Sequence, residues 1–153
     1  MRLTSFSDYT LRTLMYLGLR PDELCTIEEI ASTFSISANH LTKVVQQAAQ
    51  AGEIQTIRGQ GGGMRLARAP ETINIGTVLR RTEPDLQIAP CFGSGAACCI
   101  QPACVLQGAL GDALAAFMAV LDSLTLADLI RPKQQLSALL HLNPDGRMSD
   151  RRH

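Results

Sequence analysis

The sequence predicts a mainly α-helical fold with a small β-wing, and three observations lead to this prediction. Residues 26–52 hold two short helical patterns separated by a tight turn. Two short extended stretches joined by glycines follow them, and a long apolar helical pattern begins near residue 105. A helix-turn-helix with an adjacent hairpin is a winged helix, so we expect a winged helix-turn-helix followed by a long dimerisation helix.

The first two helices are marked by the residues expected to cap their N-termini. Ser7 is the expected N-cap of a first helix that runs to about Leu19. The second helix begins at a capping box, in which the side chain of Glu29 reaches back to the amide of Thr26. This helix is short and ends near Phe34.

The third helix is the expected recognition helix. Ser37 caps it, and Gly52 suits the left-handed position after its end. Its apolar residues recur at helical spacing and should face inward: Leu41, Val44, Val45 and Ala48. Polar side chains occupy the other side: Asn39, His40, Lys43, Gln46, Gln47 and Gln50. Asn and Gln can bond adenine at two atoms and Lys can reach guanine or phosphate, which suits a major groove; the alternative is a solvated helix face.

The predicted wing consists of residues 54–58 and 64–66, joined by a glycine-rich tip. Between residues 54 and 70 there are no acidic residues and three arginines: Arg58, Arg65 and Arg68. Arginines here can neutralise phosphates or enter the minor groove. We therefore expect Arg58, Arg65 and Gln60 of the wing to contact DNA, together with Ser37 and the polar face of the third helix.

The second half of the chain begins with a helix from Asn74 to about Arg81, which Glu83-Pro84-Asp85 ends. A long amphipathic helix starts near Val105, and its apolar stripe is Leu106, Leu110, Ala113, Leu114, Phe117, Leu121 and Leu124. Few elements remain to cover this stripe, so packing against a second copy is the simplest solution. The organisation expected is a DNA-binding domain (1–82), a cysteine-rich loop (83–104), a dimerisation segment (105–142) and a disordered tail (143–153).

Composition narrows the function classes. The chain has 14 basic and 14 acidic residues, so any nucleic-acid affinity must come from local basic groups. No signal-peptide pattern and no stretch long enough to span a bilayer is recognised, so we expect a cytoplasmic protein without a membrane partner. An enzyme is not expected, because no phosphate loop is visible and no histidine stands beside a nucleophile.

Four cysteines lie in one short segment: Cys91, Cys98, Cys99 and Cys104. Disulfides are rare in a reducing compartment, and thiolates are soft ligands for iron–sulfur clusters, zinc or copper(I). Zinc sites usually contain cysteine pairs separated by two residues, and none occurs here. The spacing favours a cluster, while buried apolar thiols are the alternative. Cys25, just before the second helix, is expected to be such a structural thiol.

Several motifs resemble the winged-helix iron–sulfur regulators, the family that includes IscR, and among them the nitric-oxide-sensing repressors. They are LTSFSDY at 3–9, NHLTKVV at 39–45, RGQGGGMRL at 58–66, PAC at 102–104 and TLADL at 125–129. The resemblance implies a homodimer that binds a pseudo-palindromic double-stranded operator. It also implies that nitric oxide attacks an iron–sulfur cluster in each protomer and thereby releases the DNA.

The resemblance further implies which residues hold the cluster. Cys91, Cys98 and Cys104 would bind a 4Fe-4S cluster (alternatively 2Fe-2S), with Asp8 of the partner subunit as the fourth ligand. Six residues separate Cys91 from Cys98, more than is usual in the family, so Cys99 could replace Cys98.

Gln107 stands where IscR-like members carry a histidine ligand, which favours the nitric oxide sensors. The alternatives are a related regulator that senses iron or redox state, and a thiol- or zinc-based winged-helix repressor.

Overall fold

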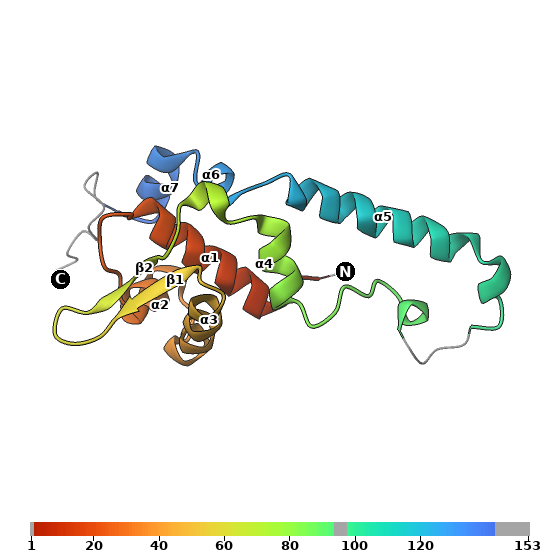
Figure 1. Cartoon of the computed structure of the whole chain (residues 1–153), viewed down its shortest axis with the longest axis horizontal. Helices are drawn as coiled ribbons and strands as arrows, with labels where there is room; N and C mark the ends of the chain where they lie inside the picture. The colour runs from red at the N-terminus through yellow and green to blue at the C-terminus, as the bar shows by residue number, and fades with distance from the viewer. Residues whose placement is uncertain (1, 94–97, 143–153) are drawn as a thin grey trace.

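A computed structural model describes residues 2–93 and 98–142 of the chain. The elements follow one another as α1 (Ser5–Leu19), α2 (Ile27–Phe34), α3 (Ala38–Gln50), β1 (Ile54–Ile57), β2 (Gly63–Leu66), α4 (Ile75–Thr82), α5 (Val105–Asp122), α6 (Leu126–Leu129) and α7 (Lys133–Leu139). Figure 1 shows that α1–α4, the hairpin, α6 and α7 form one body, from which α5 projects as an arm. The expected fold class, mainly α with a β-wing, is confirmed. The predicted tail, 143–153, lies outside the described residues.

The body is built around α1, whose inner residues meet side chains from most other elements. The fully buried core includes Leu14, Leu17, Leu41, Ile73, Val78 and Leu126. These aliphatic side chains come from α1, α3, α4 and α6 and from the segment before α4. The core therefore holds α3 against α1 on one side and the chain returning from α5 on another.

The start of α1 differs from the prediction. The helix begins at Ser5, and its N-cap is Thr4, whose hydroxyl accepts a hydrogen bond from the backbone N–H of Ser7 at 3.2 Å. The prediction that Ser7 is the cap was wrong. Ser7 lies in the first turn, where its buried hydroxyl donates to Thr82 of α4 at 2.8 Å. That contact across 75 residues uses the hydroxyl in tertiary packing.

The helix-turn-helix follows its local signals closely. Thr26 and Glu29 form the predicted capping box, and α2 ends at Phe34 as expected. Ser37 occupies the N-cap position of α3, although its hydroxyl makes no capping hydrogen bond. Gly52 adopts the left-handed conformation predicted for it, with φ of +70°. Both helices therefore begin and end where the sequence placed them.

The wing is a two-stranded antiparallel hairpin in which Ile54 pairs with Leu66 and Ile57 with Gly63. Its turn uses Gly59 and Gly61, whose φ angles of +105° and +75° suit glycine. The hairpin is anchored on its other side by Cys25, which exchanges two backbone hydrogen bonds with Met64 of β2. Cys25 is fully buried, as expected for a structural thiol.

The arm α5 leaves most of its surface uncovered by its own chain. Of its 18 residues, only Met118 is buried. The helix ends at Asp122, so Leu124, predicted as part of its stripe, lies beyond it. Asp122 forms an ion pair with Arg80 of α4, at 2.6 Å between Oδ1 and Nη1. This pair lies at the point where the arm joins the body.

The length of α5 corrects one expectation. No stretch was expected to be long enough to cross a bilayer, yet this helix has the length and mean hydropathy, 1.4, of a membrane span. The reason is its composition, because leucine, alanine and valine fill all its faces with only two acidic residues among them. Such a helix is equally suited to pack against another protein surface.

Candidate functional site

The polar face of α3 lies in solvent, while the apolar side of the helix is buried. The inward residues Leu41, Val44, Val45 and Ala48 all belong to the buried set, as the sequence predicted. The side chains predicted to contact DNA are all exposed: Ser37, Asn39, His40, Lys43, Gln46 and Gln47. The structure therefore brings these residues together on one open helix face.

This face borders the start of α1. Lys43, Gln46, Gln47 and Gln50 line a surface hollow together with Phe6. Phe6 belongs to the first turn of α1, so the hollow combines an apolar edge with amide and ammonium groups. The sequence showed the polar stripe, but Phe6 gave no local signal because α1 and α3 meet only through tertiary packing.

The predicted wing residues are exposed as well. Arg58 and Gln60 lie on or next to the turn of the hairpin, and Arg65 lies on β2. The Nε of Arg65 donates to Oε1 of Gln55 across the two strands at 3.1 Å, which holds its guanidinium along the hairpin. Figure 1 shows the hairpin and α3 at the same end of the body. A basic wing beside an amide-rich helix is the arrangement that docks a groove and its flanking phosphates.

One charged cluster next to this face was missed by the sequence reading. Arg81 of α4 forms an ion pair with Glu53, at 2.5 Å between Nη2 and Oε2, and its Nη1 donates to Oε1 of Gln47 at 3.4 Å. Glu53 is only 2% exposed, and burial raises the pKa of its carboxyl more than Arg81 and Arg68 lower it. A buried carboxylate needs such partners, but nothing in the local sequence shows which arginine supplies them.

The four cysteines of the 83–104 segment are free thiols at two depths. Cys91 lies in a short 3-10 helix, Pro90–Phe92, and Cys104 immediately precedes α5; both are half-buried. Cys98 and Cys99 are exposed. Gln107 donates from Nε2 to the backbone carbonyl of Cys91 at 3.3 Å, which ties this 3-10 helix to the first turn of α5.

The described part of the chain does not assemble a finished metal site. Within residues 2–93 and 98–142, no three histidine, cysteine or acidic side chains are close enough to hold one ion. The donor set nevertheless fits a cluster chemically, because the thiols are free and two of them flank the same end of α5. Whether Cys98 or Cys99 joins them stays open, since both are exposed.

Asp8 lies in the first turn of α1, with its side chain 43% exposed. It pairs with Arg12 one turn later, at 2.9 Å between Oδ2 and Nε. The guanidinium of Arg12 also lies over the ring of Phe34, 5.7 Å from the centroid, so this pair joins α1 to the end of α2. In the single chain, therefore, Asp8 meets a cation and not the cysteines.

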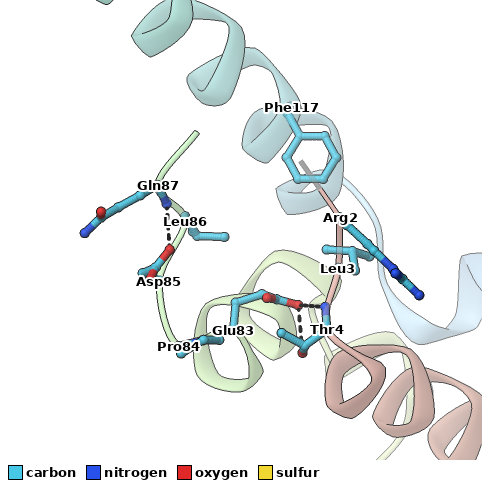
Figure 2. Close-up of a pocket in the computed structure, with 9 residues that line it drawn as sticks. All are labelled: Arg2, Leu3, Thr4, Glu83, Pro84, Asp85, Leu86, Gln87 and Phe117. Atoms are coloured by element: carbon cyan, nitrogen blue, oxygen red, sulfur yellow. Dashed lines mark hydrogen bonds between the residues drawn. The ribbon is translucent and has the colours of Figure 1, made fainter. Parts of the chain in front are cut away.

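The cysteine-rich segment is joined to the start of α1 by Glu83 (Figure 2). Its Oε1 accepts a hydrogen bond from the backbone N–H of Thr4 at 2.9 Å and another from the Thr4 hydroxyl at 3.2 Å. A small pocket lies beside this contact and is lined by Arg2, Leu3, Thr4, Glu83, Pro84, Asp85, Leu86, Gln87 and Phe117. The helix that carries Asp8 and the segment that carries the cysteines are thus connected directly.

Comparison with known proteins agrees with this arrangement. The model of the Rrf2 family, described as an iron-dependent transcriptional regulator, matches residues 3–132. An HTH-type transcriptional regulator NsrR of Bacillus subtilis is 49% identical over 144 residues, covering 93% of this chain and 99% of its own. One from Halalkalibacterium halodurans is 47% identical over 146 residues, covering 94% of this chain and all of its own.

A solved structure has the same fold. IscR from T. potens superposes with a TM-score of 0.71 at 23% identity, covering 89% of this chain and 90% of its own. The resemblance inferred from the motifs is confirmed by these relatives, which are regulators of transcription and not enzymes. The roles of individual residues stay predictions.

Proposed function

Because the chain belongs to the Rrf2 family of transcriptional regulators, we propose that it is a nitric-oxide-responsive repressor acting on a pseudo-palindromic operator as a cytoplasmic homodimer. One observation carries the proposal: the NsrR relatives match this chain over nearly its whole length, including the wing and every cysteine-bearing segment. The open face of α3 beside the arginine-bearing wing supplies a surface suited to DNA.

The homodimer is supported by the uncovered face of α5. This face differs from the predicted stripe, since Phe117 and Leu121 of that stripe pack against the protein's own core. Five apolar residues follow one another in steps of three and four and are all exposed: Leu106, Ala109, Ala113, Ala116 and Val120. Leu106 is 66% and Val120 61% exposed, and a continuous row of exposed apolar residues marks an interaction surface. Small residues between two larger ones allow a second helix to approach closely. A second copy of α5 would cover this seam and place two recognition helices for the two halves of a palindrome.

The cluster-binding part of the proposal assigns Cys91, Cys98 and Cys104 as ligands of a 4Fe-4S cluster, with Asp8 of the partner subunit as the fourth. When bound, such a cluster supplies iron that reacts with nitric oxide. The chain contributes the two half-buried thiols beside α5 and the bond from Gln107 that positions Cys91. The ion pair between Asp8 and Arg12 is exposed to solvent and therefore weak. The Asp8 carboxylate can leave Arg12 for another partner with a small loss of free energy.

The proposed link to DNA runs through α1. Asp8 and Arg12 lie on this helix, and Arg12 covers Phe34 at the end of α2. His40 of α3 stacks near Tyr9, with ring centroids 6.3 Å apart. A change in the partner of Asp8 would therefore alter the contacts that α1 makes with both helices of the helix-turn-helix, α2 and α3. This route supports the idea that losing the Asp8 bond weakens operator binding.

The decisive test is an anaerobic titration of the purified protein with nitric oxide, in which cluster absorbance and operator binding are followed together. We expect both to fall over the same range of nitric oxide. A colourless protein with stoichiometric zinc and no acid-labile sulfide would establish the thiol- or zinc-based repressor instead. A brown protein whose DNA binding ignores nitric oxide but follows iron or redox state would establish the related regulator.

The role of Asp8 is tested separately by Asp8→Ala. We expect this variant to remain a dimer, to change cluster stability or reactivity and to bind the operator more weakly when the cluster is present. Asp22→Ala is the matched control, since Asp22 is an exposed acid in the turn after α1. Wild-type spectra and affinity in Asp8→Ala would return Asp8 to the role of an ordinary acid at a helix start.

A further inference from the structure

Arg81 holds its guanidinium at a fixed place beside the recognition helix. Its Nη2 is 2.5 Å from Oε2 of Glu53, whose side chain is almost fully buried. The backbone of Glu53 is fixed in turn, because its N–H donates to Ala48 of α3 and its carbonyl accepts from Ala67 after β2, both at 2.9 Å. A buried, hydrogen-bonded carboxylate leaves its arginine little freedom to move.

The second terminal nitrogen of this guanidinium contacts Gln47 on the open face of α3. Nη1 of Arg81 donates to Oε1 of Gln47 at 3.4 Å. Arginine carries only donors, so the Gln47 amide must turn its oxygen toward Arg81. The NH₂ group on the other branch of the same amide is then directed away from the Arg81 guanidinium.

This orientation changes what Gln47 can read in a major groove. A free glutamine bonds adenine with both amide atoms, accepting from N6 and donating to N7. An amide whose oxygen is already directed at an arginine offers a donor to the DNA. A donor placed at the O6 position of guanine or the O4 position of thymine finds an acceptor, whereas adenine and cytosine present an amino group there. N7 accepts in both purines and does not distinguish them, so the selection depends on this one position of the base edge.

We propose that Arg81 is a specificity-determining residue, which orients the amide of Gln47 so that α3 selects a keto base (guanine or thymine) against an amino base (adenine or cytosine) at one position of each half-site. This inference rests on the proposed function, because it requires α3 to lie in a major groove. Arg81 itself acts through Gln47 and is a positioning residue.

The test uses the full-length wild-type protein and a randomised double-stranded DNA library, from which the bound sequences are selected. Each base pair of the selected site is then varied singly, and Gln47→Ala identifies the position that Gln47 reads as the one whose preference disappears. We expect wild-type protein to prefer guanine or thymine there, by roughly fivefold or more over adenine and cytosine. A preference for adenine at that position would overturn the proposal.

Two further variants separate the orientation of the Gln47 amide from the contribution of Arg81 to the stability of the fold. Arg81→Lys keeps the positive charge for Glu53 but replaces the planar fork with a single ammonium, so the Gln47 amide is free to turn and the keto preference should shrink toward none. Gln47→Glu keeps the contact to Arg81 and offers DNA only acceptors, so the preference should invert toward amino bases. Gln46→Glu is the matched control, which should leave the position read by Gln47 unchanged.

The outcomes distinguish this inference from the proposed function. If Arg81→Lys folds poorly, the wild-type preference at the position read by Gln47 still decides the question, because a freely turning glutamine would favour adenine there. If Lys43→Ala and Arg58→Ala weaken binding while the Gln47 variants leave every base preference unchanged, only the inference fails. If none of these variants alters selection from the library, α3 does not face the groove and the proposed mode of DNA binding fails with it.

Discussion

The Oε1 atom of Glu83 accepts a hydrogen bond from the backbone N–H of Thr4 at 2.9 Å (Figure 2). Thr4 is the N-cap of α1, and Glu83 is the first residue after α4. The contact therefore joins the start of α1, which carries Asp8, to the first residue of the segment that carries four cysteines. A change in the position of this segment would be transmitted to α1 through Glu83.

Removing this contact should destabilise the protein. Glu83→Ala leaves the N–H and hydroxyl of Thr4 without their charged acceptor, and we expect a loss of about 1–3 kcal/mol in the free energy of unfolding. Urea denaturation of the cluster-free protein measures it. Glu71→Ala, at an exposed acid, is the control and should lie within about 0.5 kcal/mol of wild type. Equal free energies of unfolding for the two variants would show that the Glu83–Thr4 contact does not stabilise the protein.

The seam on α5 predicts which substitution separates the protomers. Val120→Glu places a charge in the face proposed for the second copy, so we expect a folded monomer in sedimentation equilibrium. Ala115→Glu adds the same charge at an exposed position outside the seam, about 140° around the helix axis from Val120, and should leave a dimer. If both variants sediment as dimers, another surface joins the protomers.

The cysteine segment predicts an unequal response to single substitutions. Cys91→Ala and Cys104→Ala should abolish stable cluster assembly, because neither residue has an adjacent thiol to replace it. Cys98→Ala should retain partial cluster through Cys99, since both thiols are exposed. Absorbance and acid-labile sulfide after anaerobic reconstitution measure cluster content. Full loss in Cys98→Ala with no loss in Cys99→Ala would exclude Cys99 as a substitute, and the reverse pattern would make Cys99 the ligand.

The wing predicts a change in salt dependence. Arg58 is exposed next to the hairpin turn, and Arg58→Ala should weaken operator binding while leaving cluster content unchanged. If Arg58 contacts a phosphate, the slope of log affinity against log salt becomes shallower by about one. Lys133→Ala, an exposed cation of α7, is the control that should keep the wild-type slope. Identical affinities for Arg58→Ala and wild type at all salt concentrations would show that the wing is not docked.

Cys25 predicts a loss of stability in alkali. Burial raises the pKa of its thiol from 9.0 to about 11. Between these values the folded state binds the proton and the unfolded state releases it, so the free energy of unfolding falls as pH rises, by at most about 1.4 kcal/mol per pH unit. Denaturation from pH 8 to 11 measures the slope, which should be smaller in Cys25→Ala. Tyr16 acts in the same direction, since burial also raises its pKa. The variant and wild type must therefore be compared at each pH.

The sequence by itself determined the elements whose signals lie within a few residues. The capping box of Thr26 and Glu29, the left-handed Gly52 and the periodic apolar face of α3 are local, because each depends on contacts within one or two helical turns. The polar face of α3 followed from the same periodicity. The glycine-rich turn marked the wing for an equally local reason, since φ angles of this kind suit glycine.

Tertiary structure alone decided which distant groups meet. Ser7 was a reasonable cap on local grounds, but Thr4 takes that place while the Ser7 hydroxyl bonds Thr82, 75 residues away. Glu83 bonds Thr4 across 79 residues, and Arg81 reaches Gln47 across 34. Each polar side chain has many possible hydrogen-bond or ion-pair partners at such separations along the sequence. Only the packing of α1, α3 and α4 around one core selects among them, because an ion pair or hydrogen bond needs atoms within about 3 Å and the sequence carries no measure of that distance.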